Sequence, residues 1–226
     1  GGNISVTSTN GGVSLSANED GAFVGIGNTG GGTTTTGKVL VSALSGTVSL
    51  SSEGGVASGD DENLGTISYN ALVEIGNNSG TGNVSGDVEV NASQLTIAAT
   101  ATKATAVLGL FDEDSIGSQS GNITVNVSQS MSVGASGTNS IAQVGNWSDV
   151  GTAGGATGTI NITVANGLNL SATGDLSHAV FDARLQQVVH SAISRLMPGA
   201  PVCLYGEGLA GELALASGAL AHVGCT

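Results

Sequence analysis

A seven-residue motif recurs along the chain and constrains its fold more than any other feature of the sequence. The clearest copy is ALVEIGN at residues 71–77. Near-copies occupy residues 22–28, 106–112 and 140–146, and a looser copy starts at Ala179. Residues 219–225 can be read as a sixth. A recurring strand-sized unit is typical of a stacked array, in which each unit buries its apolar side against its neighbours.

Two shorter alternating segments precede each copy of the motif, always in the same order. In the first unit they are residues 3–6 and 13–16, where apolar residues stand at every second position. Such alternation indicates strands with one buried face. The later units have the same plan, with segments at residues 39–41, 48–51 and 71–77; 87–90, 95–97 and 106–112; 122–127, 131–133 and 140–146; and 161–164, 168–171 and 179–184.

The spacing between units supports this alignment. Gly27 to Val39, Gly76 to Val88 and Phe111 to Ile123 are each 12 residues. Three strands, three turns and a return to the starting position describe one coil of a parallel β-helix. The sequence therefore predicts an all-β parallel β-helix, or solenoid, of about five to six coils, with the repeat region at residues 1–177.

The composition agrees with stacked coils. The chain has 38 glycines, 3% aromatic residues and 9% charged residues, so small aliphatic side chains fill its interior and its turns are rich in residues that tolerate positive φ. Asparagines recur before the first strand and after the third. Such amides either form hydrogen-bonded ladders between coils or serve only as turn residues. The two sets are Asn3, Asn122 and Asn161, and Asn28, Asn77 and Asn146.

Residues 178–226 differ from the repeats. Apolar residues at helical spacing between Leu185 and Leu196, followed by Pro198 and Gly199, predict an amphipathic helix that covers the end of the rod. Residues 201–226 form either a sixth coil or a separate cap. Cys203 and Cys225 are too few for a disulfide framework, and they either pair or remain thiols.

No motif in the sequence predicts a catalytic, cofactor or metal site. The G-x-G-x-x-G spacing at 206–211 lacks the length for a dinucleotide-binding unit, and the three histidines have no zinc-ligand spacing. Acidic clusters at 19–20, 60–62 and 112–114 match no calcium loop and indicate solvated turns. Paired carboxylates can cleave polysaccharides, but the scarcity of basic and aromatic residues favours a protein that is not an enzyme.

Charge and hydropathy narrow the partners. The net charge of −13 disfavours nucleic acid and anionic membranes, and no window has the roughly 18 apolar residues of a membrane span. The chain does not start with Met, so we expect a mature product or a fragment. Coil ends are natural docking edges, which predicts self-association, end to end into filaments; the alternative partners are host or matrix surface ligands.

Two of the repeat units resemble those of filamentous-haemagglutinin-like exoproteins, the secreted adhesins of bacterial two-partner secretion. They are SGNITVNVSQSMSVGASGTNSIAQVGN and GTINITVANGLNLSATG, and the likeness extends over residues 1–184. The resemblance implies a right-handed β-helix, export to the cell surface or the extracellular space, and an adhesive or structural role. It carries over no functional residue. The alternative is a polysaccharide-binding or polysaccharide-cleaving β-helix.

Overall fold

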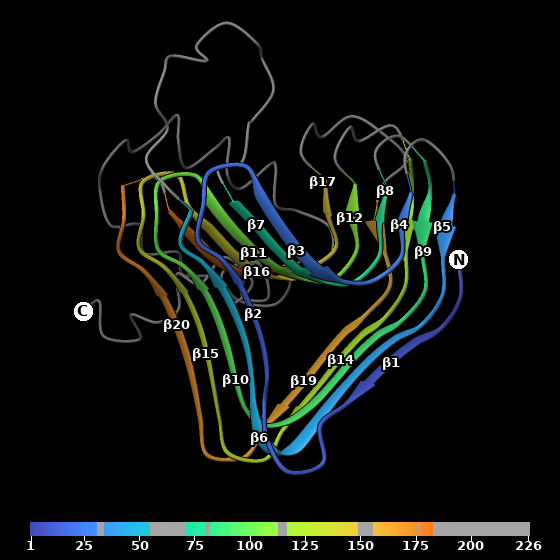
Figure 1. Cartoon of the computed structure of the whole chain (residues 1–226), viewed down its shortest axis with the longest axis horizontal. Helices are drawn as coiled ribbons and strands as arrows, with labels where there is room; N and C mark the ends of the chain where they lie inside the picture. The colour runs from blue at the N-terminus through green and yellow to red at the C-terminus, as the bar shows by residue number, and fades with distance from the viewer. Residues whose placement is uncertain are drawn as a thin grey trace, which may run out of the picture.

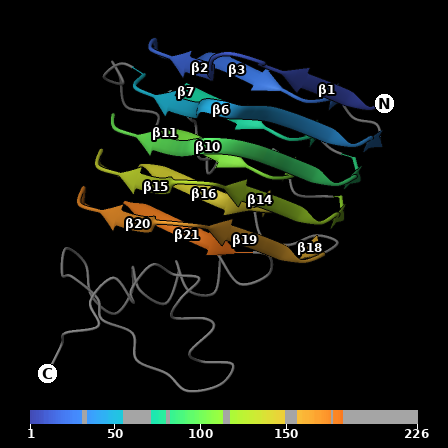
Figure 2. The ribbon, with the colours of Figure 1, turned by 90° about the horizontal axis from the view of Figure 1, so that it is seen from below.

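A computed structural model of the chain describes residues 1–30, 34–54, 71–79, 82–112, 117–148, 156–175 and 177–182. These residues form a parallel β-solenoid of four complete coils and the three main strands of a fifth, stacked one below another in Figure 2. The predicted all-β parallel solenoid with three main strands in each coil is therefore confirmed. Two short strands that the sequence analysis did not predict complete each of the first four coils.

The strands follow one another in the same order in every coil. The first coil contains β1 (Ile4–Thr7), β2 (Val13–Ala17), β3 (Ala22–Ile26), β4 (Thr29–Gly30) and β5 (Thr35–Thr36). The second contains β6 (Val39–Ser52), β7 (Ala71–Ile75), β8 (Asn78–Ser79) and β9 (Val84–Ser85). The third contains β10 (Val88–Ala99), β11 (Ala104–Leu108), β12 (Phe111–Asp112) and β13 (Gln119–Ser120). The fourth contains β14 (Ile123–Val127), β15 (Ser130–Ala135), β16 (Ile141–Gly145), β17 (Trp147–Ser148) and β18 (Ala156–Thr157). The fifth contains β19 (Ile160–Val164), β20 (Gly167–Ala172) and β21 (His178–Asp182).

Four parallel sheets run along the solenoid (Figure 1). The largest, sheet A, joins β1, β6, β10, β14 and β19, and its second limb joins β2, β6, β10, β15 and β20. Sheet B has the order β21-β16-β11-β7-β3. The short strands form sheet C, β17-β12-β8-β4, and sheet D, β18-β13-β9-β5. In the second and third coils the two limbs of sheet A are one bent strand, where the sequence predicted two segments.

Side chains alternate between the interior and the outside along sheet A, as the sequence pattern predicts. In β6 and β10 the inward residues are buried and their neighbours are mostly partly exposed. Equivalent aliphatic residues stack on one another from coil to coil, so each coil buries its apolar side against the next. One row, for example, contains Leu15, Leu50, Ile97, Val133 and Leu170.

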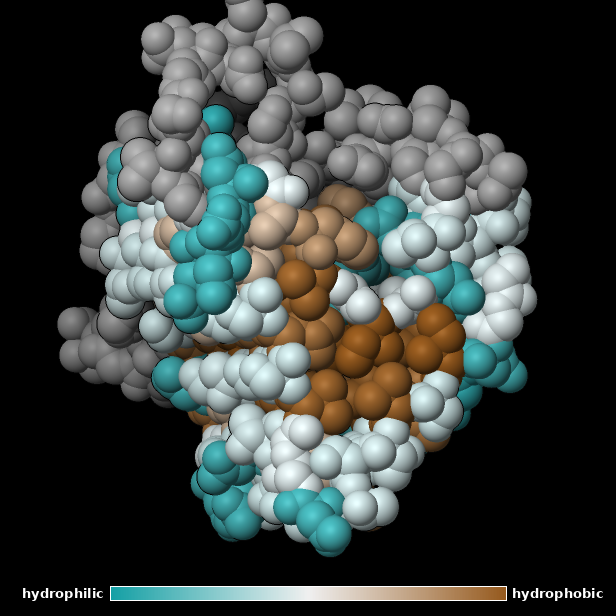
Figure 3. Space-filling view, viewed as in Figure 1, coloured by the Kyte–Doolittle hydropathy of each residue, from teal (hydrophilic) through white to brown (hydrophobic). Residues whose placement is uncertain are grey.

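The first coil is less buried than the coils that follow it. Val6, Val13, Val24 and Ile26 point inward but are only partly buried, whereas their equivalents in the second coil are fully buried. Figure 3 looks onto this end of the solenoid and shows an apolar patch at its centre. The interior of the solenoid therefore opens at its N-terminal end.

The register corrects three alignments made from the sequence. In the third coil Ala104, and not Ala106, pairs with Ala71, so the 12-residue spacing from Phe111 to Ile123 does not join equivalent positions. In the fifth coil Ile160 pairs with Ile123, and Asn161 therefore stacks on Thr124 rather than on Asn122. Ala179 likewise pairs with Ala142 and is two places further along its strand than predicted.

Each of these errors is a shift of two residues. Because side chains in a strand alternate with a period of two, such a shift leaves the same residues pointing inward. The hydrophobic pattern therefore does not distinguish the two registers, and the turns determine which register forms. Each residue advances a strand by 3.2–3.4 Å, and turns of different length in different coils accommodate the two-residue difference.

The predicted helix at 185–196, both cysteines and the proposed sixth coil lie outside the described residues. The predicted boundary at 177/178 is not tested by the structure, since of the C-terminal segment only the strand His178–Asp182 is described. Among the described residues no helix is long and apolar enough to cross a membrane.

Candidate functional site

The turn after sheet B contains an asparagine pair that joins the first coil to the second. The side-chain Nδ2 of Asn28 donates to Oδ1 of Asn77 at 3.0 Å, and the backbone N–H of Asn28 donates to the same oxygen at 3.1 Å. Nδ2 of Asn77 donates to the carbonyls of Gly37 and Ser85 at 2.6 and 2.9 Å. Asn77 is fully buried, and its amide satisfies backbone groups that water does not reach.

The ladder is interrupted in the third coil. Leu110 occupies the equivalent position, so no side-chain amide is available there. Its backbone N–H donates to Oδ1 of Asn146 in the fourth coil at 3.2 Å, as that of Asn28 does to Asn77. The two alternatives predicted for these asparagines, an amide ladder and a role in turns alone, are thus each confirmed in part. Asn28 and Asn77 form an amide ladder, and Asn146 is a turn residue.

A second polar row precedes the first strand of each coil, on the outside. Oδ1 of Asn3 accepts the backbone N–H of Lys38 at 2.9 Å, and Oδ1 of Asp87 accepts that of Asn122 at 2.9 Å. Oδ1 of Asn122 in turn accepts the backbone N–H of Thr159 at 3.0 Å. The sequence analysis placed Asn161 in this row, but the register gives the position to Thr159.

The outer flank of sheet A has further side-chain contacts between coils. Asn126 donates to Asn91 at 2.9 Å, and Gln94 donates to Gln129 at 3.1 Å. The first bond joins paired positions of β10 and β14, as in other stacked amide ladders, whereas Gln129 lies in the turn between β14 and β15. Both bonds connect the third coil to the fourth on the solvent side.

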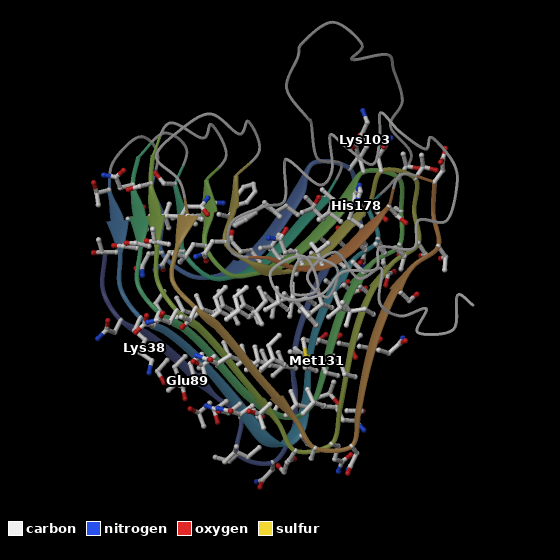
Figure 4. All side chains as sticks on the ribbon, turned by 180° about the vertical axis from the view of Figure 1, so that it is seen from behind. Lys38, Glu89, Lys103, Met131 and His178 are labelled. Atoms are coloured by element: carbon white, nitrogen blue, oxygen red, sulfur yellow. The ribbon has the colours of Figure 1, made fainter. Side chains whose placement is uncertain are left out.

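One ion pair on this flank spans the second and third coils. Nζ of Lys38 lies 2.6 Å from Oε2 of Glu89, and Figure 4 shows the two side chains side by side. A hydrogen bond from Asn91 and a second from Lys38 lower the pKa of the Glu89 carboxyl. The hydrogen bond to Glu89 and its negative charge raise the pKa of Lys38. Both residues are therefore charged at neutral pH.

A shallow groove of about 300 Å³ crosses the second limb of sheet A. Its polar lining includes Gln94, Thr96, Ser132 and Asn169. The half-exposed side chain of Leu168 supplies part of its apolar lining. These groups can donate and accept hydrogen bonds, but no carboxylate, histidine or cysteine lines this groove. The lining thus suits the binding of a neutral polar ligand better than acid–base chemistry.

The outer face of sheet B is buried, which the alternating pattern does not predict. Leu72, Val107, Phe111 and Ile141 form a second apolar cluster there, separate from the interior of the solenoid. Three polar side chains on the same face, Glu74, Thr105 and Gln143, are also buried. Nδ2 of Asn78 donates to Oε2 of Glu74 at 3.2 Å. Burial on both faces makes this sheet the most enclosed part of the solenoid.

The residues with potential chemistry are dispersed where the structure describes them. Glu19 and Asp20 lie in the turn between β2 and β3, and His178 begins β21, where it pairs with Ile141 (Figure 4). Among the described residues no three of the histidines, cysteines and acidic residues are grouped as metal ligands would be. Several other candidates lie outside the described residues. They are the acidic cluster at 60–62, the glycine motif at 206–211, the other two histidines and both cysteines.

Continuous parallel sheets and polar ladders between stacked coils define this chain as a parallel β-solenoid protein. No family model, curated protein sequence or solved structure is detectably similar to it.

Proposed function

We propose that this protein is a non-enzymatic structural or adhesive protein of the cell surface or the extracellular space. The observation that carries the proposal is that side-chain hydrogen bonds link successive coils both inside and outside the solenoid. Asn77 makes such a bond inside, and Asn91 and Gln94 make them on the outer surface. These side chains hold a repetitive rod together and present a regular polar flank. A rod of this kind suits a spacer or an extended binding surface.

The external location is supported by the sequence. The repeats resemble those of filamentous-haemagglutinin-like exoproteins, and their strand pattern folds into a solenoid, as in such an exoprotein. With a net charge of −13 the chain is repelled by anionic lipid and nucleic acid, which favours a role exposed to solvent.

Labelling of intact native cells tests the location. Antibodies raised against purified protein are applied before and after permeabilisation, and intact cells are treated with protease in parallel. We expect labelling without permeabilisation, or protein in the culture medium, and loss of the cell-bound signal on protease treatment. Labelling confined to permeabilised cells, with the protein absent from the medium, would contradict the proposal.

The groove on sheet A favours a second function, the binding of polysaccharide. Its amide and hydroxyl groups match the hydrogen-bonding pattern of sugars. A glycan array with the wild-type protein and the Gln94→Ala and Asn169→Ala variants tests it, and Asn126→Ala, outside the groove lining, is the control. Loss of binding in the two groove variants alone would support this function. Release of new reducing ends from a bound glycan would show cleavage instead.

A further inference from the structure

The outer face of sheet B is buried from the second coil to the fifth. On this face Val107 and Gln143 are fully buried, and Leu72 and Val180 are 8% and 7% exposed. Phe111 packs at one side of the face. The other described strands in close contact with sheet B belong to sheet A, which lies on its inner side (Figure 1). Since parallel sheets are generally covered on both faces, a further layer must lie on the outer one.

Two rows of side chains on this face run along the axis of the solenoid. Successive coils are about 4.8 Å apart, so each row extends over about 14 Å from the second coil to the fifth. The rows are two residues apart along each strand, a distance of about 6.6 Å. An α-helix is about 10 Å across with its side chains, so one helix along the axis covers both rows. One row contains Leu72, Thr105, Ile141 and His178, and the other contains Glu74, Val107, Gln143 and Val180.

The chain leaves sheet B at one side of this face. The last strand of the sheet, β21, ends at Asp182 in the fifth coil. Connections between a strand and a helix commonly have 2–6 residues. The helix that the sequence predicts at 185–196 therefore starts within reach of the outer face.

Residues 185–196 have the length and the pattern of a covering helix. At a rise of about 1.5 Å per residue this segment is about 18 Å long, which matches the rows from the fifth coil to the second. Its apolar residues recur at helical spacing and form one stripe, as in a helix that packs on a sheet. They are Leu185, Val188, Val189, Ala192, Ile193 and Leu196.

The charge of this segment is complementary to that of the solenoid. Residues 183–206 contain no Asp or Glu, although the net charge of the chain is −13. Arg184 and Arg195 lie along one border of the apolar stripe, because 11 residues are close to three full helical turns. The outer face of sheet B contains the buried carboxylate of Glu74. A nearby cation offsets the cost of burying a carboxylate, so this segment suits the face.

The longest connection between two strands of the solenoid is a less suitable cover. Residues 55–70 join β6 to β7, next to Glu74. They contain Asp60, Asp61 and Glu62 and no basic residue. Packed on this face, they would bring negative charge to the buried carboxylate of Glu74.

Burial also distinguishes the outer face of sheet B from the end of the rod, where the sequence pattern placed the helix. Leu168, an inward residue of the fifth coil, is 50% exposed, and Ile160 and Val164 are only partly buried. Val107 and Gln143 on the outer face are fully buried. The protein thus covers this face more completely than the last described coil.

We propose that residues 185–196 form a helix that docks on the outer face of sheet B, with its first turn at the fifth coil and its last turn at the second. Its apolar stripe packs on the second apolar cluster. The contact lies within one chain and goes beyond the structural role proposed above. It closes sheet B to other partners and leaves the polar outer surface of sheet A, with its groove, to bind ligands.

Engineered disulfides test the position and the direction of the helix. In the proposed arrangement Leu196 lies over Leu72 in the second coil, and Val189 lies over Ile141 in the fourth. The matched pairs are Leu72→Cys with Leu196→Cys and Ile141→Cys with Val189→Cys. The exchanged pairs, Leu72→Cys with Val189→Cys and Ile141→Cys with Leu196→Cys, are the controls. Their residues would be about 10 Å apart along the axis, beyond the Cα···Cα range of about 4.4–6.8 Å of a disulfide.

The assay uses the full chain with Cys203→Ser and Cys225→Ser, so that only the introduced thiols can pair. Folded protein is oxidised mildly, separated under denaturing conditions without reducing agent, and mapped by peptide mass spectrometry. We expect the matched pairs to form a disulfide within one chain in at least about tenfold greater yield than the exchanged pairs, because only they meet the distance limit. Ile162→Cys with Ile193→Cys, which joins the interior of the fifth coil to the helix, should give no more than the exchanged pairs.

A charged residue in the stripe tests the apolar contact without cysteines. Val189→Asp places a carboxylate against the apolar cluster, and Ser194→Asp adds the same charge on the opposite side of the predicted helix. We expect Val189→Asp to lower the thermal unfolding midpoint by roughly 5–10 °C and to increase the binding of a hydrophobic dye. Ser194→Asp should change the midpoint by less than about 2 °C.

Four outcomes would overturn the inference. Exchanged pairs that crosslink as well as matched pairs, or matched pairs that do not crosslink, show that the helix does not hold this position. A disulfide between Ile162→Cys and Ile193→Cys alone places the helix at the end of the solenoid. Crosslinks between two chains assign the face to a second copy. Equal effects of Val189→Asp and Ser194→Asp contradict the burial of the stripe.

Discussion

Asn28 and Asn77 are 49 positions apart in the sequence, yet two hydrogen bonds from Asn28 converge on one oxygen of Asn77. The pair links the turns of the first and second coils. Asn77 also donates hydrogen bonds to the carbonyls of Gly37 and Ser85. A single buried amide thus fixes the position of two coils relative to one another.

Asn77→Leu tests this role. The substitution fits the space, because Leu110 occupies the equivalent position one coil later, but it leaves the carbonyls of Gly37 and Ser85 without their donor. We expect a loss of about 3 kcal/mol in the free energy of unfolding, measured with denaturant. Asn28→Leu, at a partly exposed position, should cost less, about 1 kcal/mol. Equal losses would contradict the assignment.

Gly76→Ala tests the close approach of coils at the turn. A Cβ atom at Gly76 would lie 1.5 Å from the carbonyl oxygen of Gly109, and its φ of 155° is also unfavourable for other residues. Because the neighbour is backbone, we expect a loss of more than about 4 kcal/mol or failure to fold. Gly134→Ala is the control, since its Cβ would be 3.9 Å from the carbonyl oxygen of Ser171. Thermal unfolding measures both.

Ile75→Ala and Ile26→Ala compare the middle of the solenoid with its open end. The two isoleucines stack in one row, but Ile75 is fully buried and Ile26 is partly exposed. We expect a loss of about 2–5 kcal/mol at Ile75. At Ile26 the apolar area removed from water is smaller, so a loss of about 1–2 kcal/mol is expected. Similar losses in dilute protein would show that the first coil is already covered.

The Lys38–Glu89 pair predicts a small dependence of stability on pH. The pKa of Glu89 is lowered from its ordinary value of 4.5, so its contribution is present above that pH and is lost as the pH falls through the folded-state pKa. The pKa of Lys38 is raised from 10.5, so its contribution is present below that pH and is lost as the pH rises through the folded-state pKa.

A double-mutant cycle with Glu89→Gln and Lys38→Met measures the pair. The side chains are 29% and 47% exposed, so solvent screens them and we expect a coupling of at most about 1 kcal/mol near neutral pH. It should vanish in acid and weaken in high salt. A coupling that persists well below pH 4.5 would contradict the ionic interpretation.

The sequence predicted the coil and its strand order because alternation and the ALVEIGN motif are local. The motif at 22–28 aligns with 71–77 as expected, and Ser140 occupies the position of Ala71. The burial of the outer face of sheet B, with Glu74 among apolar residues, was not predictable, since Glu74 alternates with inward residues as a solvated residue would. The groove on sheet A also escaped prediction, because its lining comes from three different coils.

By itself the sequence determined which side of each strand faces inward, because that depends only on a period of two along the chain. The tertiary structure decided which residue of one coil lies on which residue of the next. Ala104 rather than Ala106 stacks on Ala71, and Thr159 rather than Asn161 follows Asn122. A shift of two residues keeps every apolar side chain inside, so only hydrogen bonds between coils and the close approach of backbone at the turns distinguish one register from another.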